Sequence, residues 1–176
     1  LLLLFSAFQI TSVYAQEEKT IKRKVAIGRF SNETQYAKGL FYDKDNDPMQ
    51  KQAMDILSSK LASSGKFILL EREDLDLLVK ETGENMKKIG ADYIILGSIT
   101  EYGRKTEGHQ KVFSSTKTQT VEAGVSIRLV ETATGLIIYS DEAKGFAETT
   151  TKQTLGVGGT AGFDATLSDK AITAAL

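Results

Sequence analysis

The sequence ADYIILGSITEY, from Ala91 to Tyr102, is the strongest strand signal in the chain and decides how the rest is arranged. It is rich in β-branched and aromatic residues, which favour a pleated, largely buried strand. Two strand-then-helix patterns precede it and two further strand patterns follow it. We therefore expect this strand to lie in the interior of a sheet that carries helices.

Upstream, the pattern predicts a strand followed by a well-capped helix. KVAIGRF, at Lys24 to Phe30, is the predicted strand. Asp47 is a suitable N-cap, and Pro48 suits the first helical position. The helix is expected to run to about Ser64 and to stop at Gly65. Its predicted inner face consists of apolar side chains at helical spacing, namely Met49, Ala53, Ile56, Leu57 and Leu61.

A second strand and helix are expected between Gly65 and Ala91. FILL, at Phe67 to Leu70, is a short continuous apolar run and predicts a strand buried on both faces. The acidic segment from Glu71 to Asp74 then opens a helix, because negative charge complements the helix dipole. Leu75, Leu78 and Val79 are expected to face inward on this helix.

Downstream, a polar stretch from Gly103 to Thr120 is followed by a predicted hairpin. Its strands are Val121 to Glu131 and Leu136 to Ala147, joined by a Thr-Ala-Thr-Gly turn. A second polar, glycine-rich stretch covers Glu148 to Phe163. TLSD, from Thr166, resembles a capping box that opens a last helix with Ala171, Ile172 and Leu176 inward. The order β-α-β-α-β-β-β-α predicts an α/β fold with a mixed sheet and packed helices.

The N-terminus indicates export. Leu1 to Ile10 is an almost unbroken apolar run followed by Val13-Tyr14-Ala15, which is typical of a signal peptide cleaved after Ala15. We expect residues 1–15 to be a truncated signal peptide, 16–23 a linker and 24–176 one domain whose C-terminus is also truncated. Because Gln16 and not cysteine follows the cleavage site, the predicted product is periplasmic and not lipidated through cysteine.

The composition offers little for catalysis or cofactor binding. With 22 basic and 23 acidic residues, the chain has no excess of positive charge of the kind that binds nucleic acid. It has no cysteine, and His109 is the only histidine, so zinc ligands and a nucleophile–base pair are poorly supplied. His109 is expected to be a solvated side chain. We predict no enzyme activity, no cofactor and no metal site.

Two motifs superficially suggest ligands. Asp43 to Asp47 begins like a calcium loop, but Pro48 occupies the glycine position and Met54 the bidentate glutamate position. We interpret this segment as a solvated loop that ends in a helix cap. GVGGTAG, at Gly156 to Gly162, lacks the Gly-Lys-Ser/Thr of a phosphate loop and lies late in the chain, so we interpret it as a turn or strand of small residues.

Several segments in series resemble the curli production assembly/transport (CsgG) family. The matching segments are KVAIGRFSNET from Lys24, LASSGKFILLEREDLDLLVKE from Leu61, GADYIILGSITEYG from Gly90, VSIRLVETATGLIIYSDEAKG from Val125 and DKAITAAL from Asp169. The resemblance implies a periplasmic α/β domain. It also implies that protomers can form a secretion ring in which each protomer gives two β-hairpins to a membrane channel. In such a ring, a loop with aromatic and Asn side chains narrows the channel.

The polar hairpin regions favour a soluble member of this family over a protomer of a membrane channel. Lys111 to Thr120 (KVFSSTKTQT) has no apolar face that could contact hydrocarbon. The leading hypothesis is a non-catalytic envelope protein that acts by protein contacts in secretion or in fibre or envelope assembly. The predicted contact residues lie in the loop after the first strand and match the aromatic and Asn types of the family loop: Tyr36, Phe41, Tyr42 and Asn46.

Other functions remain open at this point. One alternative is an outer-membrane secretion channel protomer in a homo-oligomeric ring, and another is a periplasmic activator of a cell-wall synthase. The expected partners are other envelope proteins, including fibre subunits, with no nucleic acid. Association with the outer membrane is left open.

Overall fold

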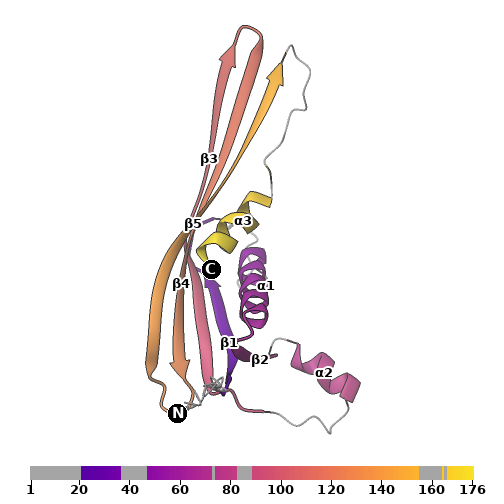
Figure 1. The fold of residues 1–176 in the computed structure, drawn as a ribbon, viewed down its shortest axis with the longest axis vertical. Helices are drawn as coiled ribbons and strands as arrows, with labels where there is room; N and C mark the ends of the chain where they lie inside the picture. The colour runs from indigo at the N-terminus through magenta and orange to yellow at the C-terminus, as the bar shows by residue number, and fades with distance from the viewer. Residues whose placement is uncertain (1–20, 37–46, 73, 83–88, 155–163, 165) are drawn as a thin grey trace, which may run out of the picture.

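The computed structural model describes residues 21–36, 47–72, 74–82, 89–154, 164 and 166–176. Within these ranges, five strands form one sheet in the spatial order β2-β1-β3-β4-β5, and α1 and α3 pack on one face of it (Figure 1). The bounds are β1 Arg23–Asn32, α1 Pro48–Ser63, β2 Phe67–Leu70, α2 Leu75–Thr82, β3 Tyr93–Lys111, β4 Ser114–Glu131, β5 Ile137–Thr154 and α3 Thr166–Ala175. This order confirms the predicted β-α-β-α-β-β-β-α series and the α/β class.

The sheet is mixed, as predicted. β2, β1 and β3 run parallel, while β4 and β5 add to β3 as antiparallel neighbours. β3 therefore lies at the centre of the sheet, where its apolar run pairs with β1 on one side and β4 on the other. Ile95 and Ile99 are buried under the helices. The prediction that ADYIILGSITEY occupies the interior of the sheet is confirmed.

The core lies between the sheet and the two helices α1 and α3. The predicted inner face of α1 is confirmed, with Met49, Ala53 and Leu57 buried and Ile56 and Leu61 partly buried against the core. α3 adds a second set of buried side chains over β4 and β5, which are Leu167, Ala171, Ile172 and Ala175. The sheet contributes Ile27, Phe30, Ile95, Ile99, Val121 and Val125.

The capping of α1 follows the sequence prediction. Asp47 is the N-cap, and its Oδ1 accepts hydrogen bonds from the backbone N–H groups of Met49 (2.8 Å) and Gln50 (3.2 Å). Pro48 occupies the first turn, and Gly65 follows the C-cap with φ of +64°. The calcium-like segment thus ends in a helix cap at Asp47, while its remaining residues lie outside the described ranges.

β2 and α2 depart from the prediction. The expectation that FILL is buried on both faces is wrong, because β2 is an edge strand with a 46% exposed Ile68. α2 lies beyond this edge, away from α1 and α3 (Figure 1). Leu75 and Val79 are partly buried, but Leu78 is exposed, so its predicted inward position is wrong. Little of the described part of the chain lies close enough to α2 to cover its apolar face.

The polar stretches next to the hairpin are strands. β3 continues through Lys111, β4 begins at Ser114, and β5 continues to Thr154. Residues 103–111, 114–120 and 148–154 form a three-stranded ribbon that projects beyond α3, here called the arm (Figure 1). The second polar stretch is therefore a strand up to Thr154, and GVGGTAG lies outside the described residues. The predicted turn between β4 and β5 is confirmed, with Gly135 at φ of +75°.

The start of α3 differs from the predicted capping box. Asp164, not Thr166, accepts the terminal hydrogen bonds, from the Thr166 N–H (3.0 Å) and the Thr166 hydroxyl (2.7 Å). These bonds from Thr166 lower the pKa of the Asp164 carboxyl. Ala171 and Ile172 are buried as predicted and Leu176 is partly buried. Gly145 of β5 allows α3 to approach closely, since a Cβ there would lie 2.0 Å from the Ala171 carbonyl oxygen.

Candidate functional site

A buried polar network joins the end of β1 to the start of α1. Asn32 is 6% exposed and Asp47 is 1% exposed. The Asn32 Nδ2 donates to Asp47 Oδ2 at 2.9 Å and also to the Tyr36 carbonyl oxygen at 3.4 Å. A buried carboxylate needs such donors, because leaving it unpaired is costly. Both residues that flank segment 37–46 are therefore tied to one side chain.

The same asparagine also shapes the turn that leaves β1. Its Oδ1 accepts hydrogen bonds from the Thr34 N–H (3.0 Å) and the Thr34 hydroxyl (2.7 Å). The Thr34 Oγ1 in turn accepts the Tyr36 N–H at 3.2 Å. Asparagine commonly bonds to the backbone two residues ahead in this way and stabilises a turn. The chain thus enters segment 37–46 from a fixed position.

Tyr36 connects this network to the base of the arm. Its ring lies against Tyr102 of β3, with the centroids 4.3 Å apart and the planes tilted by 41°. The Arg104 guanidinium lies 4.6 Å from the Tyr36 centroid and donates to the Tyr102 hydroxyl at 3.1 Å. Stacking and cation–π contacts of this kind each stabilise by about 0.5–1.5 kcal/mol. The rings hold Tyr36 over the strand and leave it partly exposed.

α3 completes the site from the other side. The Tyr102 hydroxyl hydrogen-bonds the buried Ser168 hydroxyl of α3. The Gln119 side chain of β4 is 2% exposed, and its Oε1 accepts the Asp164 N–H at 2.9 Å. Tyr36, the base of the arm and α3 therefore meet at one junction of stacked rings and hydrogen bonds. We call the residues Asn32, Thr34, Tyr36, Asp47, Tyr102, Arg104 and Ser168 the loop platform.

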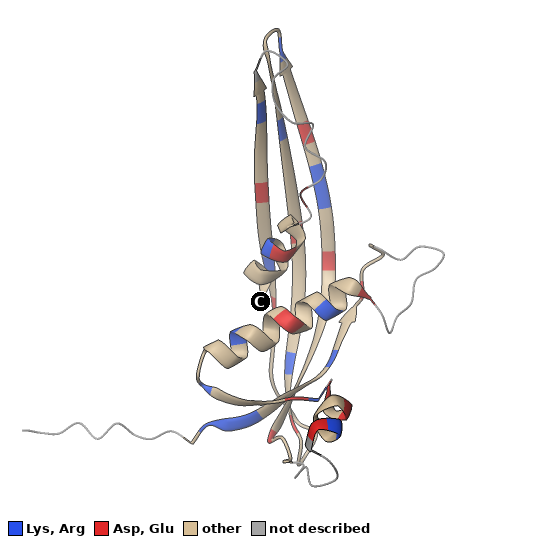
Figure 2. Ribbon diagram, turned by 90° about the vertical axis from the view of Figure 1, so that its right-hand side faces the viewer, with Lys and Arg blue, Asp and Glu red and all other residues tan. Residues whose placement is uncertain are grey.

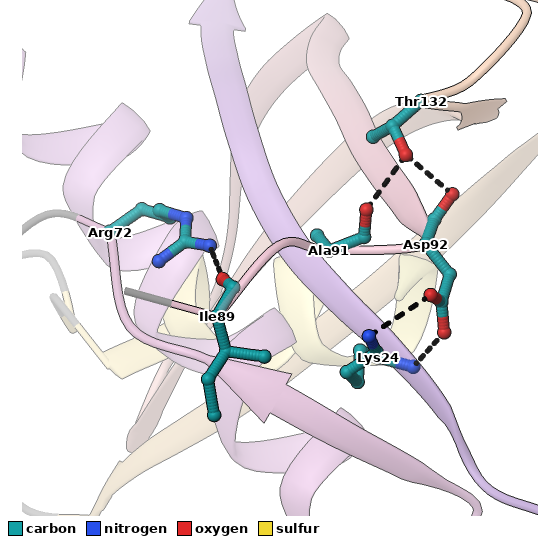
Figure 3. A network of polar contacts seen from close by, with 6 residues as sticks. All are labelled: Lys24, Arg72, Ile89, Ala91, Asp92 and Thr132. Atoms are coloured by element: carbon teal, nitrogen blue, oxygen red, sulfur yellow. Dashed lines mark hydrogen bonds and ion pairs between the residues drawn. The ribbon is translucent and has the colours of Figure 1, made fainter. Parts of the chain in front are cut away.

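A second polar network lies at the opposite end of the sheet (Figure 3). Asp92 accepts the Lys24 N–H at 2.9 Å and pairs with its Nζ at 3.3 Å. The backbone hydrogen bond from Lys24 is the largest cause of the lowered pKa of Asp92, and the positive charge of the lysine lowers this pKa further. The Thr132 hydroxyl donates to the carbonyl oxygens of Ala91 and Asp92, and Arg72 donates to that of Ile89. These bonds fix strand ends and the β4–β5 turn, so we assign them a structural role.

The face of the sheet opposite the helices carries ion pairs at the base of the arm. Lys144 of β5 pairs with Glu101 of β3 and lies 3.8 Å from a Glu122 oxygen of β4. The hydrogen bond to Glu101 raises the pKa of Lys144. Thr100 donates to Glu142 at 2.8 Å. Such exposed pairs contribute little stability, but they bridge β3, β4 and β5 where the arm begins.

An apolar groove of about 430 Å³ separates the C-terminal ends of α1 and α3. Its apolar lining includes Leu57, Leu61, Phe67, Ile127 and Tyr139. Lys60, Lys66 and Asp141 add polar groups to its lining. The groove offers apolar surface without a titratable cluster suited to chemistry.

The described residues contain no group of three or more His, Cys, Asp or Glu side chains placed to hold a metal ion. His109 lies exposed on the arm, as the sequence predicts for a solvated side chain. The polar atoms of the loop platform are used in hydrogen bonds with one another. The arrangement is thus suited to fixing Tyr36 and Asp47, the two residues that flank segment 37–46.

The predicted contact residues are only partly placed by the structure. Tyr36 lies in the loop platform, whereas Phe41, Tyr42 and Asn46 lie outside the described residues. Sequence reasoning missed Asn32, although Asn-Glu-Thr after a strand is a turn signal that could have marked it. It also missed Tyr102 and Arg104, which look like ordinary strand and loop residues until the fold brings them to Tyr36.

Solved structures with a similar fold come from several bacteria. The lipoprotein GNA1162 of Neisseria meningitidis is 18% identical with a TM-score of 0.41, covering 72% of this chain and 84% of its own. The PelC dodecamer of Paraburkholderia phytofirmans is 15% identical with a TM-score of 0.42, covering 88% and 83%. Among the described residues, no helix is both long and apolar enough to cross a bilayer.

Sequence comparison identifies the family. Residues 6–176 match the family described as "Curli production assembly/transport component CsgG". The chain is also 32% identical, over 171 residues, to "Putative lipoprotein NMB1126/NMB1164" of Neisseria meningitidis serogroup B, covering 93% of this chain and 75% of that protein. The protein belongs to the CsgG family, a family of cell-envelope proteins, which confirms the resemblance drawn from its segments.

Proposed function

We propose that this protein is a non-catalytic component of the bacterial periplasm that acts by protein–protein contacts in secretion or in fibre or envelope assembly. The observation that carries the proposal is the loop platform. Asn32 bonds to both residues that flank segment 37–46, namely Tyr36 and Asp47. Tyr36 stacks on Tyr102 at the base of the arm, and Tyr102 in turn hydrogen-bonds Ser168 of α3. A binding loop on a rigid scaffold loses less conformational entropy when a partner binds.

The proposed contact residues are Tyr36, Phe41, Tyr42 and Asn46. Aromatic side chains bury large areas at low entropic cost, so they supply much of the affinity of protein interfaces. Tyr36 is partly exposed even while it stacks on Tyr102. The proposed partners are other envelope proteins, including fibre subunits. The proposed location is periplasmic, after cleavage at Ala15 and without lipidation through cysteine.

A homo-oligomeric ring is the second candidate, and the two edges of the sheet, which pair with no further strand among the described residues, favour it. β2 and β5 are the edge strands, and they run in the same direction. Ile68 on β2 and Ile137 on β5 are exposed apolar side chains. If β2 of one copy met β5 of the next, the contact would be head-to-tail. Contacts of this kind give a ring when the rotation from copy to copy closes.

Fractionation of the full-length protein, followed by size analysis, separates these functions. The proposed function predicts periplasmic material of monomer size, and its isolation with one envelope partner would support the contact role. Membrane rings that resist heat and detergent would overturn it in favour of a channel protomer. Recovery with a cell-wall synthase, with fibre export unchanged, would overturn the secretion role in favour of an activator.

A further inference from the structure

The free end of the arm is formed by two exposed apolar residues. Val112 and Phe113 make the two-residue turn between β3 and β4, and they are 89% and 70% exposed. Two-residue hairpin turns favour Asn, Asp and Gly, which tolerate the required backbone angles. A β-branched residue and an aromatic one are poor choices for local structure. Such a departure from turn chemistry indicates that the side chains serve another purpose.

The charges around this turn are all positive. Residues 108–117 and 149–154 contain Lys111, Lys117 and Lys152 and no Asp or Glu. The acidic residues of the arm, Glu107 and Glu148, lie nearer the domain along their strands, since Glu107 pairs with Thr118 and Glu148 pairs with Thr120. In Figure 2 the coloured band nearest the free end of the arm is blue, the colour of Lys and Arg. Glu107 is also paired with a lysine, which lowers the pKa of its carboxyl. The end of the arm therefore carries a local positive charge although the whole chain carries a net charge of −1.

The three lysines surround the ribbon. Lys111 and Lys152 belong to one face, because they pair with Ser114 and Thr116 of β4. Lys117 of β4 belongs to the other face. At about 3.3 Å per residue along a strand, all three lie within about 15 Å of the turn. Lysine side chains can extend toward a charged surface while their stems stay along the strand.

We propose that the end of the arm docks on an anionic lipid bilayer. Val112 and Phe113 enter the boundary between the headgroups and the acyl chains, and the lysines contact the lipid phosphates. An apolar tip with adjacent basic residues is complementary to such a surface in both polarity and charge. The arm does not span the bilayer in this arrangement, since only its turn is apolar. The proposal is independent of the loop platform and of the proposed partner contacts.

Tryptophan fluorescence tests the position of the turn directly. The chain contains no tryptophan, so Phe113→Trp introduces a single reporter. The matched control is Phe146→Trp, because Phe146 of β5 is 62% exposed but lies outside the arm. Each variant of the full chain is mixed with vesicles of phosphatidylcholine alone or with phosphatidylglycerol. We expect the emission of Phe113→Trp to shift to shorter wavelength only with anionic vesicles, and that of Phe146→Trp to stay unchanged.

Charge substitutions give a second, quantitative readout. Each lysine near an anionic surface strengthens binding by roughly five-fold. Lys111→Gln with Lys152→Gln in the reporter variant should therefore weaken vesicle binding by roughly 25-fold, with an unchanged circular dichroism spectrum. The proposal is overturned if Phe113→Trp shows no shift, if Phe146→Trp shifts equally, or if the double lysine variant binds as tightly as its parent.

Discussion

Exchanging the two side chains at the centre of the loop platform is the sharpest perturbation of this site. Asn32→Asp places a second carboxylate where an amide now donates to Asp47 Oδ2 at 2.9 Å. Asp47→Asn instead brings two amide donors together. The double variant Asn32→Asp with Asp47→Asn restores one donor and one acceptor. The helix cap would be kept in both variants that carry Asp47→Asn, because asparagine caps helices about as well as aspartate.

The expected magnitudes follow from burial and bonding. Asp47 is 1% exposed, so removing its donor and adding a like charge should cost about 3–5 kcal/mol, as for a broken buried charged pair. Asp47→Asn should cost about 1.5–3 kcal/mol, the value of a hydrogen bond to a charged group. The double variant should cost only about 1 kcal/mol, from the lost bond to the Tyr36 carbonyl oxygen. The coupling energy, taken as the sum of the two single costs minus the cost of the double variant, is therefore expected to be about 3.5–7 kcal/mol, above the roughly 0.5–3 kcal/mol usual for residues in one network.

Urea unfolding of the four proteins at pH 7 measures this cycle. The Asn32→Asp variant should also recover stability at acidic pH, because protonating one of the facing carboxyls restores a donor. Single variants that each cost less than about 1 kcal/mol would show that the bond between Asn32 and Asp47 contributes little to the folded state. A double variant that costs the sum of the singles would show that the two side chains do not interact as described.

Two further predictions concern other parts of the fold. Gly145→Ala should destabilise the protein by about 1–3 kcal/mol in thermal unfolding, because the added Cβ would meet the α3 backbone. The control Gly103→Ala, which has open space around it, should change the stability by no more than about 0.5 kcal/mol. Equal effects of the two substitutions would contradict the close packing of β5 against α3. Asp92→Asn should lose stability at neutral pH but not at strongly acidic pH. The pKa of Asp92 is lowered by Lys24 in the folded state, so its contribution is present above the ordinary carboxyl pKa and is lost as pH falls through the lowered value. A difference from the parent that is the same at every pH would contradict the assignment.

The order of elements could be predicted because periodicity and caps act locally. Asp47-Pro48 and Gly65 set the ends of α1, and the apolar run at the start of β3 identifies the central strand. The arm could not be predicted as strand, since its Ser, Thr, Lys and Gln side chains give no apolar face and only pairing with neighbours makes it extended. The exposure of Leu78 could not be predicted either, because periodicity shows a helix face without showing whether anything covers it.

The sequence indicates where the loop after β1 lies in the chain, but it does not indicate which residues contact the start of that loop. The loop after β1 could be located because the helix cap at Asp47 follows it. The contacts that hold it join positions far apart in the chain, such as Tyr36 with Tyr102 and Tyr102 with Ser168. No local pattern marks such partners, because an aromatic residue in a strand looks the same whether it stacks on a loop or on the core.

Site-specific photocrosslinking in cells tests the central claim most directly. A photoreactive amino acid is placed at position 42 of the full-length protein, within segment 37–46, and at the exposed position 63 on α1 as a control. The proposed contact role predicts a discrete adduct with an envelope protein from position 42, none from position 63, and a weaker adduct when Asn32→Asp is added. It is contradicted if position 42 gives no adduct, or if position 63 gives the same adducts.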